Sequence, residues 1–293
     1  MATEPAGRRI RIPLNMRPVT ILFLVALITL PPSVNGQERP FPYSLSSSDL
    51  LMLPGSLLLS QWGAREADVS REPLTLQEIR ELKRGDVNRF DRSATGNWSW
   101  EWGDRSDEYR DRVIVATIGI GMYETVRSRD LDEIATMGVM FLEAAFLVRG
   151  TTYLAKGLVG RKRPFVYNTA LDPEFRYRQA LDDGNDVFHS FFSGHTVAAF
   201  SLATFTSSVF TDIHGPSTLS HLLWGSTLTL ATLTAYARVK AGVHYPSDVI
   251  VGAIVGSAIG FLVPALHRHG RPERVALEIL PDRVGFRFQI GSR

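Results

Sequence analysis

The apolar and polar positions of the chain change character near residue 112. Residues 38–112 are polar and mixed, apart from a short apolar patch at Leu50–Leu59 that Pro54 and Gly55 interrupt. Beyond this point the chain holds five apolar segments of helical length: Val113–Val126, Ile134–Val148, Thr196–Phe210, Leu219–Ala237 and Val249–Leu266. This pattern predicts an all-α fold in the form of a helical bundle.

Two weaker patterns flank the bundle. Apolar residues recur at helical spacing over Leu74–Leu82, which predicts a short amphipathic helix. Near the C-terminus, Arg274–Leu280 and Val284–Ile290 alternate partially on either side of a turn sequence, which predicts a short β-hairpin. We therefore expect a polar, exported lead-in region at 37–112, a catalytic helical domain at 113–268 and a C-terminal tail at 269–293.

The first 36 residues have the layout of an export signal. Four arginines precede the apolar run Val19–Leu30, and Pro31, Pro32 and a stretch of small residues follow it. A run of twelve apolar residues suits a signal peptide, whereas an extension to Val34 allows an uncleaved membrane anchor. In both cases the arginines hold the N-terminus inside, and the chain after about residue 37 is expected outside the cytoplasm.

The five apolar segments fit either a membrane-embedded bundle or a soluble bundle with buried helices. They are rich in Ala, Gly, Ser and Thr, as packed membrane helices are, but several fall short of the roughly 20 residues of a full span. Arginines between the first two segments and a basic cluster after the last favour a membrane bundle with these two regions in the cytoplasm. The opposite helix ends would then face the periplasm or the exterior of a bacterial-type inner membrane.

The composition excludes several classes of function. The 293 residues include 32 Lys and Arg against 30 Asp and Glu, and a formal net charge of +2 does not indicate a nucleic acid partner. The chain has no cysteine, which excludes thiol catalysis, disulfides and thiolate metal sites.

Three polar clusters fall at helix ends on the same predicted side, and the first runs from Lys156 to Pro164. Lys156 and Arg163 are seven residues apart, so within a continuous helix they lie two turns apart on one face. Two fixed cations on one face suit a phosphate group. A basic run of this kind also occurs as a solvated loop or a loop that contacts lipid headgroups.

The second cluster is Ser193, Gly194 and His195, directly before the apolar segment that starts at Thr196. Ser193 is expected to be an N-cap, and the free backbone N–H groups of a helix N-terminus bind anions. Gly194 would let a ligand approach the backbone closely. Ordinary helix capping also accounts for this tripeptide when it is considered alone.

The third cluster contains Arg238, His244 and Asp248 and joins the last two apolar segments. Pro246 is expected to begin the last helix, which places Asp248 in its first turn. From there the carboxylate can reach one ring nitrogen of His244, fix the tautomer and leave the other nitrogen free. Together with the other clusters, this pairing indicates a phosphate site with a reactive histidine.

In chain order the clusters read Lys-x6-Arg-Pro, Ser-Gly-His and Arg-x5-His-x3-Asp. Over roughly residues 113–267 the sequence resembles the superfamily of type-2 phosphatidic acid phosphatases and vanadium-dependent haloperoxidases. It departs from the usual pattern at two positions. Phe192 stands where a proline commonly precedes Ser-Gly-His, and Ala237 stands where a serine commonly precedes the arginine. Neither replaces a residue expected to make or break bonds.

The resemblance implies a metal-independent phosphate site with a helical fold of this family. The phosphoryl oxygens would be bound by Lys156, Arg163, Ser193, Gly194 and Arg238. No cofactor and no metal are implied, because the three cationic side chains supply the charge that Mg²⁺ supplies in other phosphoryl-transfer enzymes.

The resemblance also implies a catalytic role for three residues. His244 would be the nucleophile that attacks phosphorus, and Asp248 would orient it. His195 would protonate the leaving oxygen and then activate the water that hydrolyses the phosphohistidine. His189 is interpreted as a pocket-rim or structural residue, and His214 and His221 are interpreted as non-catalytic.

The expected function is hydrolysis of a phosphate monoester or diphosphate, with a lipid or isoprenoid phosphate as substrate and the membrane as partner. Three alternatives share these motifs: a soluble exported acid phosphatase of broad specificity, a vanadate-dependent haloperoxidase, and an inactive membrane protein that binds phosphate or lipid. Nothing beyond the phosphate motifs indicates halide chemistry, and intact catalytic residues argue against an inactive protein.

Overall fold

The computed structural model describes residues 40–268 and the strands 275–280 and 283–288, so the expected export signal lies outside the described residues. The described part is helical apart from the two strands, which confirms the all-α prediction. Its helices are α2 (Asp49–Asp68), α3 (Leu76–Glu81), α4 (Trp100–Ser128), α5 (Leu131–Val159), α6 (Pro173–Asp183), α7 (Gly194–His214), α8 (Thr218–Lys240) and α9 (Pro246–His267). Short 3-10 helices are η1 (Arg84–Asp86), η2 (Arg92–Gly96), η3 (Pro164–Tyr167) and η4 (Gly184–Phe188).

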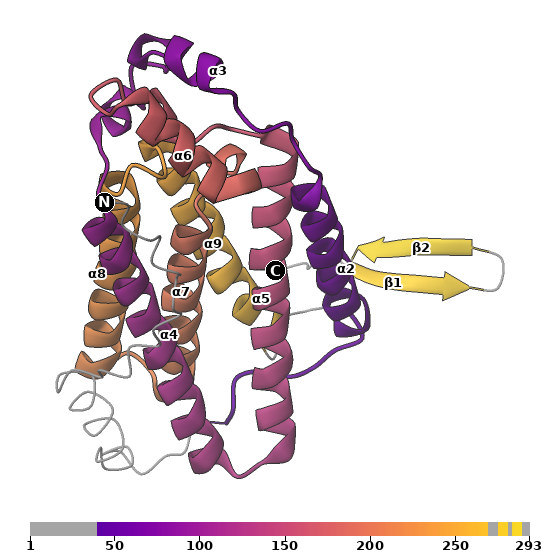
Figure 1. Ribbon diagram of the computed structural model, residues 1–293. Helices are drawn as coiled ribbons and strands as arrows, with labels where there is room; N and C mark the ends of the chain where they lie inside the picture. Colours follow the sequence, from indigo (N-terminus) through magenta and orange to yellow (C-terminus); the bar gives the residue numbers. More distant parts are fainter. Residues whose placement is uncertain (1–39, 269–274, 281–282, 289–293) are drawn as a thin grey trace.

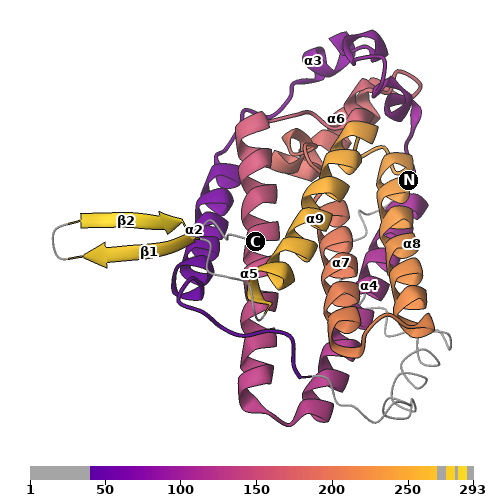
Figure 2. The same ribbon diagram turned by 180° about the vertical axis from the view of Figure 1, so that it is seen from behind.

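The long helices form an up-and-down bundle. Both ribbon views place α5 and α2 side by side at one edge and α8 at the opposite edge, with α7 and α9 between them (Figures 1 and 2). The short helices α3 and α6 lie over one end of the bundle, where α5 and α8 end and α4, α7 and α9 begin. We call this the capped end and the opposite one the distal end.

Two helices are longer than their apolar patterns predict. Helix α4 begins at Trp100, because the Ser99 hydroxyl accepts a hydrogen bond from the Trp102 backbone N–H and caps a charged first turn. Helix α5 continues to Val159 and ends where Gly160 adopts a left-handed conformation with φ of 58°. The boundary expected at residue 113 is therefore placed too late, because apolar periodicity does not detect charged helical turns.

The predicted lead-in region 37–112 also contributes a helix to the bundle. Helix α2 packs along α5, and Pro54 lies inside it without ending it. Glycines allow the two backbones to approach closely. A Cβ atom on Gly150 would lie 2.8 Å from the Ser60 nitrogen, and one on Gly157 would lie 2.8 Å from the Ala67 nitrogen. The description of this region as only a polar lead-in was wrong, since α2 is part of the packed body.

The direction of α2 bears on topology. Its last turns lie at the capped end, where the Asn185 side-chain amide donates to the Ala67 carbonyl at 2.9 Å. Its first residue, Asp49, lies at the distal end beside His267 at the end of α9. Residues 40–48 therefore belong to the distal end, whereas the sequence argument placed them on the same side as the three polar clusters.

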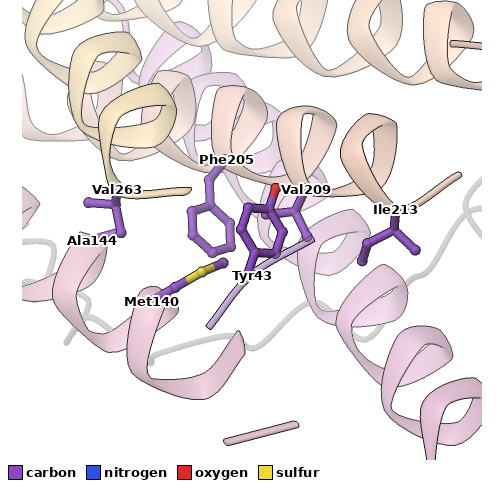
Figure 3. Packing of buried hydrophobic residues seen from close by; sticks show 7 residues of the cluster. All are labelled: Tyr43, Met140, Ala144, Phe205, Val209, Ile213 and Val263. Carbon is purple, nitrogen blue, oxygen red and sulfur yellow. The ribbon is translucent and has the colours of Figure 1, made fainter. Parts of the chain in front are cut away.

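A hydrophobic cluster fixes this N-terminal segment to the distal half of the bundle. Figure 3 shows the Tyr43 ring among side chains from α5, α7 and α9. The Tyr43 hydroxyl donates to Asp212 Oδ2 at 2.6 Å, and the Ser44 N–H donates to the His267 carbonyl at 2.9 Å. The cluster comprises Tyr43, Met140, Ala144, Phe205, Val209, Ile213 and Val263.

Among the described residues, two helices, α7 and α9, are long and apolar enough to cross a membrane. Helix α7 is largely buried within the bundle, whereas α9 exposes apolar side chains along its length, including Ile250, Ile254 and Phe261. Exposed large apolar residues also occur on α2, α4 and α5, such as Leu58 and Met122. Many exposed apolar side chains on several helices are typical of proteins that contact lipid.

The C-terminal strands β1 (Val275–Leu280) and β2 (Arg283–Phe288) pair as an antiparallel hairpin, in a register that places Val275 opposite Phe288. The hairpin projects from the bundle beside α2 (Figure 1).

Candidate active site

The residues of the three sequence clusters lie together at the capped end. The end of α5 supplies Lys156, the start of α7 supplies His195, and the end of α8 supplies Arg238. His244 lies in the turn between α8 and α9 and is buried. Burial lowers the pKa of His244 well below its usual value, and the charges of Arg238, Arg163, Lys156 and His195 lower it further. This histidine is therefore neutral and surrounded by cations.

Local backbone geometry fixes the position of His244. Gly242 adopts a φ of 77° in the turn, and its carbonyl accepts a hydrogen bond from the Phe165 N–H at 3.0 Å. The Nδ1 atom of His244 donates to the Ser190 carbonyl at 2.7 Å. This hydrogen bond sets the tautomer in which Nε2 carries the lone pair. The ring is thus held with Nε2 free of this contact.

Asp248 is positioned in the first turn of α9 as expected, because Pro246 begins that helix. Its direct contact with His244 is looser than predicted, however. The distance from Asp248 Oδ2 to His244 Nδ1 is 3.7 Å, and the same oxygen accepts from the Ser190 hydroxyl at 2.6 Å and from the Tyr245 N–H at 2.8 Å. Asp248 therefore acts on the histidine through its charge and through Ser190, which supplies the closer partner.

A buried polar network behind Asp248 was not anticipated from the sequence. Arg161 bridges two carboxylates, with Nη1 at 2.5 Å from Asp248 Oδ1 and Nη2 at 2.7 Å from Asp91 Oδ2. Asp91 also accepts from the backbone N–H and hydroxyl of Ser247, at 2.9 and 2.7 Å. The guanidinium of Arg161 lies 3.8 Å from the centroid of the Tyr245 ring. Arg161 belongs to the basic run from Lys156 to Pro164 and was not among the predicted site residues, yet it is the centre of this network.

Lys156 and Arg163 do not lie on one helical face. Gly160 ends α5 between them, and Arg163 precedes Pro164, which disfavours helical geometry at that residue. The two cations nevertheless lie close enough for their charges to interact. Burial lowers the pKa of Lys156 to about 8; Asp186 opposes this shift, and Arg163 adds to it.

Arg163 is held by the segment that follows α6. Its Nη1 lies 2.8 Å from Asp183 Oδ2, its Nη2 lies 3.7 Å from Asp186 Oδ2, and its backbone N–H donates to the Val187 carbonyl at 2.8 Å. Asp186 is also 3.1 Å from His189 Nδ1, and this hydrogen bond is the main cause that lowers the pKa of Asp186 to about 2. His189 is buried and supports the site from outside, in agreement with a structural role.

Ser193 occupies the N-cap position of α7, but its hydroxyl does not cap the helix. It accepts a hydrogen bond from the Thr196 hydroxyl at 3.0 Å instead. The first turn of α7 therefore receives no side-chain cap from Ser193, and free N–H groups of this kind bind anions. A Cβ atom on Gly194 would lie 3.3 Å from Thr152 Cγ2 and 3.9 Å from Lys156 Nζ, so this backbone lies close to the lysine.

His195 has a carboxylate partner that the sequence did not reveal. Its Nε2 lies 2.7 Å from Asp107 Oδ1 on α4. Burial favours the neutral carboxyl, but the hydrogen bond from His195 and the nearby arginines lower the pKa of Asp107 overall. On the same helix, the Ser106 hydroxyl accepts from Arg238 Nη1 at 3.3 Å. Because Asp107 precedes the first apolar segment, the sequence argument assigned it to the lead-in region.

His214 lies outside this site. It ends α7 at the distal end, where its Nε2 contacts Glu124 Oε1 at 2.6 Å.

The arrangement at the capped end suits the binding of a phosphate group beside a reactive histidine. It combines a neutral, fixed histidine, three cations from separate segments, the free N-terminus of a helix and a second histidine that is paired with a carboxylate. Comparison with known families agrees with this description. Residues 137–271 match the family described as the PAP2 superfamily.

Over this segment, which is a little under half of its length, the chain is similar to the PAP2 superfamily. A segment of 83 residues is 32% identical to the lipid A 4'-phosphatase of Porphyromonas gingivalis and covers 28% of this chain and 32% of that protein. The chain thus matches about a third of the length of this curated relative. The crystal structure of a transmembrane PAP2 type phosphatidylglycerolphosphate phosphatase from Bacillus subtilis aligns with 85% of this chain and 94% of that chain, at 18% identity and a TM-score of 0.38.

The two departures from the usual PAP2 motifs are both buried. Phe192 directly precedes the Ser193 N-cap, and its ring packs edge-to-face on that of Phe191, with centroids 5.7 Å apart. Ala237 lies in the last turns of α8 and is completely buried next to Arg238. Both positions have become apolar packing contacts beside the site.

Proposed function

We propose that this PAP2 superfamily chain hydrolyses the phosphate monoester or diphosphate of a lipid or isoprenoid through a phosphohistidine on His244. The observation that carries the proposal is the convergence of Lys156, Arg163 and Arg238 on a neutral histidine whose Nδ1 is already bonded. Fixed cations stabilise the charge that develops on the phosphoryl oxygens, and the free Nε2 is the available nucleophile.

The proposed reaction has two steps. In the first, the lone pair of His244 Nε2 forms a bond to phosphorus while the bond to the leaving oxygen breaks and His195 donates a proton to that oxygen. In the second, His195 takes a proton from water, the oxygen of this water attacks phosphorus, and the P–N bond breaks. Because Nε2 of His195 contacts Asp107, Nδ1 is the nitrogen that exchanges the proton. Burial and the charge of Arg238 lower the pKa of His195 to about 4, and the Asp107 carboxylate opposes this shift by stabilising the imidazolium form.

A lipid substrate is favoured by an apolar groove near the site. Helices α4 and α5 meet at their connecting turn and separate toward the capped end (Figure 1). A groove of about 290 Å³ lies between them and α7, lined by apolar groups that include Ile114, Val148 and Leu202. The matched relative is itself named for a reaction on a lipid phosphate. A groove of this kind accommodates an acyl or isoprenoid chain while the headgroup reaches the cations.

The central test is phosphate release by wild type and His244→Ala across phosphatidate, undecaprenyl diphosphate, phosphatidylglycerol phosphate and a soluble aryl phosphate. We expect the variant to lose at least about a thousandfold in turnover, since removal of a covalent nucleophile leaves only binding effects. Rapid quenching of wild type with labelled substrate should trap an acid-labile phosphoenzyme that the variant lacks. Unchanged turnover in the variant would exclude the phosphohistidine, and preference for the aryl phosphate would exclude a lipid substrate.

We further propose that the bundle is embedded in a membrane with the capped end outside. The basic residues Arg127 and Arg129 lie at the distal end, which favours a cytoplasmic position for that end. Residues 40–48 then lie on the cytoplasmic side, because α2 runs from the distal to the capped end. The sequence analysis expected the chain after about residue 37 to lie outside the cytoplasm. If α2 crosses the membrane with the other helices, this orientation contradicts that expectation.

The absence of cysteine makes this orientation directly measurable. Ser47 and Ser70 are exposed and lie beyond the two ends of α2, so single Ser47→Cys and Ser70→Cys variants form a matched pair. In intact cells, an impermeant maleimide should label Ser70→Cys, and it should label Ser47→Cys only after permeabilisation. The reverse pattern would invert the orientation, and equal labelling of both variants would indicate a body that does not cross the membrane.

A further inference from the structure

Three buried ligand groups converge in the distal half of the bundle, far from the active site. They come from three helices: Asp49 is the first residue of α2, Glu143 lies in the middle of α5, and His267 is the last residue of α9. One ligand atom from each residue lies within 4.8 Å of the other two. The Nε2 atom of His267 is 3.1 Å from Asp49 Oδ1 and 3.4 Å from Glu143 Oε2.

Two of the three residues, Glu143 and His267, have ligand atoms without a hydrogen-bond partner among the described residues, whereas the Asp49 carboxylate accepts from Ser46 through Oδ2. Glu143 is completely buried, and neither of its carboxylate oxygens accepts a hydrogen bond from any described residue. The Nδ1 atom of His267 donates to the Val263 carbonyl at 2.8 Å, and Nε2 is buried without a hydrogen bond within the described part of the chain. An imidazole whose other nitrogen is bonded to a backbone carbonyl is the usual arrangement of a metal-binding histidine.

The charges of the cluster also favour a cation. Two carboxylates face each other here, and no ion pair joins either of them to a lysine or arginine among the described residues. Protonation of His267 would still leave one net negative charge in a buried position, where an uncompensated charge is costly. A divalent cation with a neutral imidazole makes the site electrically neutral.

We propose that Asp49, Glu143 and His267 bind a divalent transition-metal cation of the Zn²⁺ or Mn²⁺ kind. Imidazole and carboxylate ligands together suit these ions, and metal–ligand bonds of about 2.1 Å place tetrahedral ligand atoms roughly 3.4 Å apart. The separations of 3.1 and 3.4 Å agree with that geometry. Asp49 is the most exposed of the three, so the ion and a coordinating water can reach the site from its side.

The ion would hold α2 on the bundle. Through the ion, Asp49 at the start of α2 would be connected to Glu143 on α5 and to His267 on α9. The site takes no part in phosphoryl transfer, because Asp248 and His267 lie near opposite ends of α9, about 28 Å apart at about 1.5 Å per residue. The metal therefore contributes to stability, and its loss should leave the chemistry at His244 unchanged.

The test uses the full-length chain in detergent, stripped with a chelator and then titrated with Zn²⁺ or Mn²⁺ alone. We expect one equivalent of metal per chain by elemental analysis and a rise of about 5 °C or more in the unfolding temperature at a hundredfold excess over Kd. In Glu143→Gln and His267→Gln the stoichiometry should fall below about 0.2, with phosphatase turnover retained. Co²⁺ bound to the wild type should give visible d–d absorption typical of four or five ligands.

Glu124→Gln is the matched control, because Glu124 is another buried glutamate on a distal helix end that pairs with a single histidine, His214. Its metal stoichiometry should equal that of wild type. The proposal is overturned if stripped wild type binds neither ion and its unfolding temperature does not change when either ion is added. It is also overturned if Glu143→Gln binds metal as wild type does. Should that variant fail to fold, the Co²⁺ spectrum of wild type and the metal content of Asp49→Asn decide the question.

Discussion

The two ends of the bundle use the same residue types for opposite purposes. At the capped end, His244 and His195 lie among three cations, with carboxylates placed behind them as partners. At the distal end, His267 lies between two carboxylates that no described lysine or arginine contacts. Histidine occurs at both ends. The charges around it therefore decide whether a site attracts an anion or a cation.

The two histidines are held by the same kind of hydrogen bond. Both His244 and His267 donate Nδ1–H to a backbone carbonyl, at 2.7 and 2.8 Å, which leaves Nε2 with its lone pair. The carbonyl of Ser190 belongs to a loop, whereas that of Val263 belongs to the preceding turn of α9. A fixed tautomer is thus common to both sites, and the nearby charges suit the proposed bond from Nε2 to phosphorus in one and the proposed bond to a metal in the other.

Apart from the loss of His244 itself, Asp248→Asn should lower turnover more than the other substitutions considered below. We expect turnover to fall by about a hundredfold or more, because Ser190 and the charge near His244 Nδ1 both depend on this carboxylate. The structure also predicts a stability loss of about 3 kcal/mol, since Arg161 would keep only Asp91 as its ionic partner. Steady-state kinetics and chemical denaturation measure the two quantities.

Glu124→Gln serves as the control for this prediction, because it removes a buried carboxylate at the distal end. It should reduce stability while turnover stays within about twofold of wild type. Wild-type turnover in Asp248→Asn would remove Asp248 from the site and leave the orientation of His244 to the Ser190 carbonyl alone.

The sequence predicted the helical fold, and it selected the site residues that the structure gathers at the capped end. Apolar segments located the long helices, and Pro246 correctly marked the start of α9. The supporting residues were not predictable in this way. Asp107 and Asp91 act over 88 and 70 residues of chain separation, on His195 and Arg161, and neither lies in a motif. Such pairs are set by packing, which a local pattern does not encode.

The same limit explains the two errors about α2 and the distal end. Leu50–Leu59 was too short and too interrupted to be read as a bundle helix, although glycines on α5 provide the surface on which α2 packs. The sequence could not show that Glu143, noted only as a charge within an apolar helix, would meet His267 across 124 residues of sequence. The only sign of this site in the sequence was the charge of Glu143 within an apolar helix. The residues that contact it could be identified only from the folded structure.

Asp107→Asn should have an intermediate effect on the capped end. The carboxamide oxygen of the variant would still accept a hydrogen bond from His195 but would no longer stabilise its imidazolium form, so we expect turnover to fall by about tenfold to a hundredfold with little change in KM. The pH at which turnover is half-maximal should shift as well, which a purely structural role would not produce. Asp111→Asn removes a nearby carboxylate on α4 that contacts Arg110. It should match wild type in both measurements.

Lys156→Arg should give the smallest effect at neutral pH and a clear one in alkali. Burial lowers the pKa of Lys156 to about 8, so the cation that binds phosphate is present below pH 8 and is lost as the pH rises through that value. The kcat/KM of wild type should therefore fall above pH 8, whereas that of Lys156→Arg should remain level there, because arginine stays protonated. A bound phosphate raises the pKa of the lysine, so the alkaline fall in kcat should occur at higher pH than that in kcat/KM. If the alkaline fall is identical in both proteins, another group produces it, and Lys156 does not supply a titrating cation to the anion site.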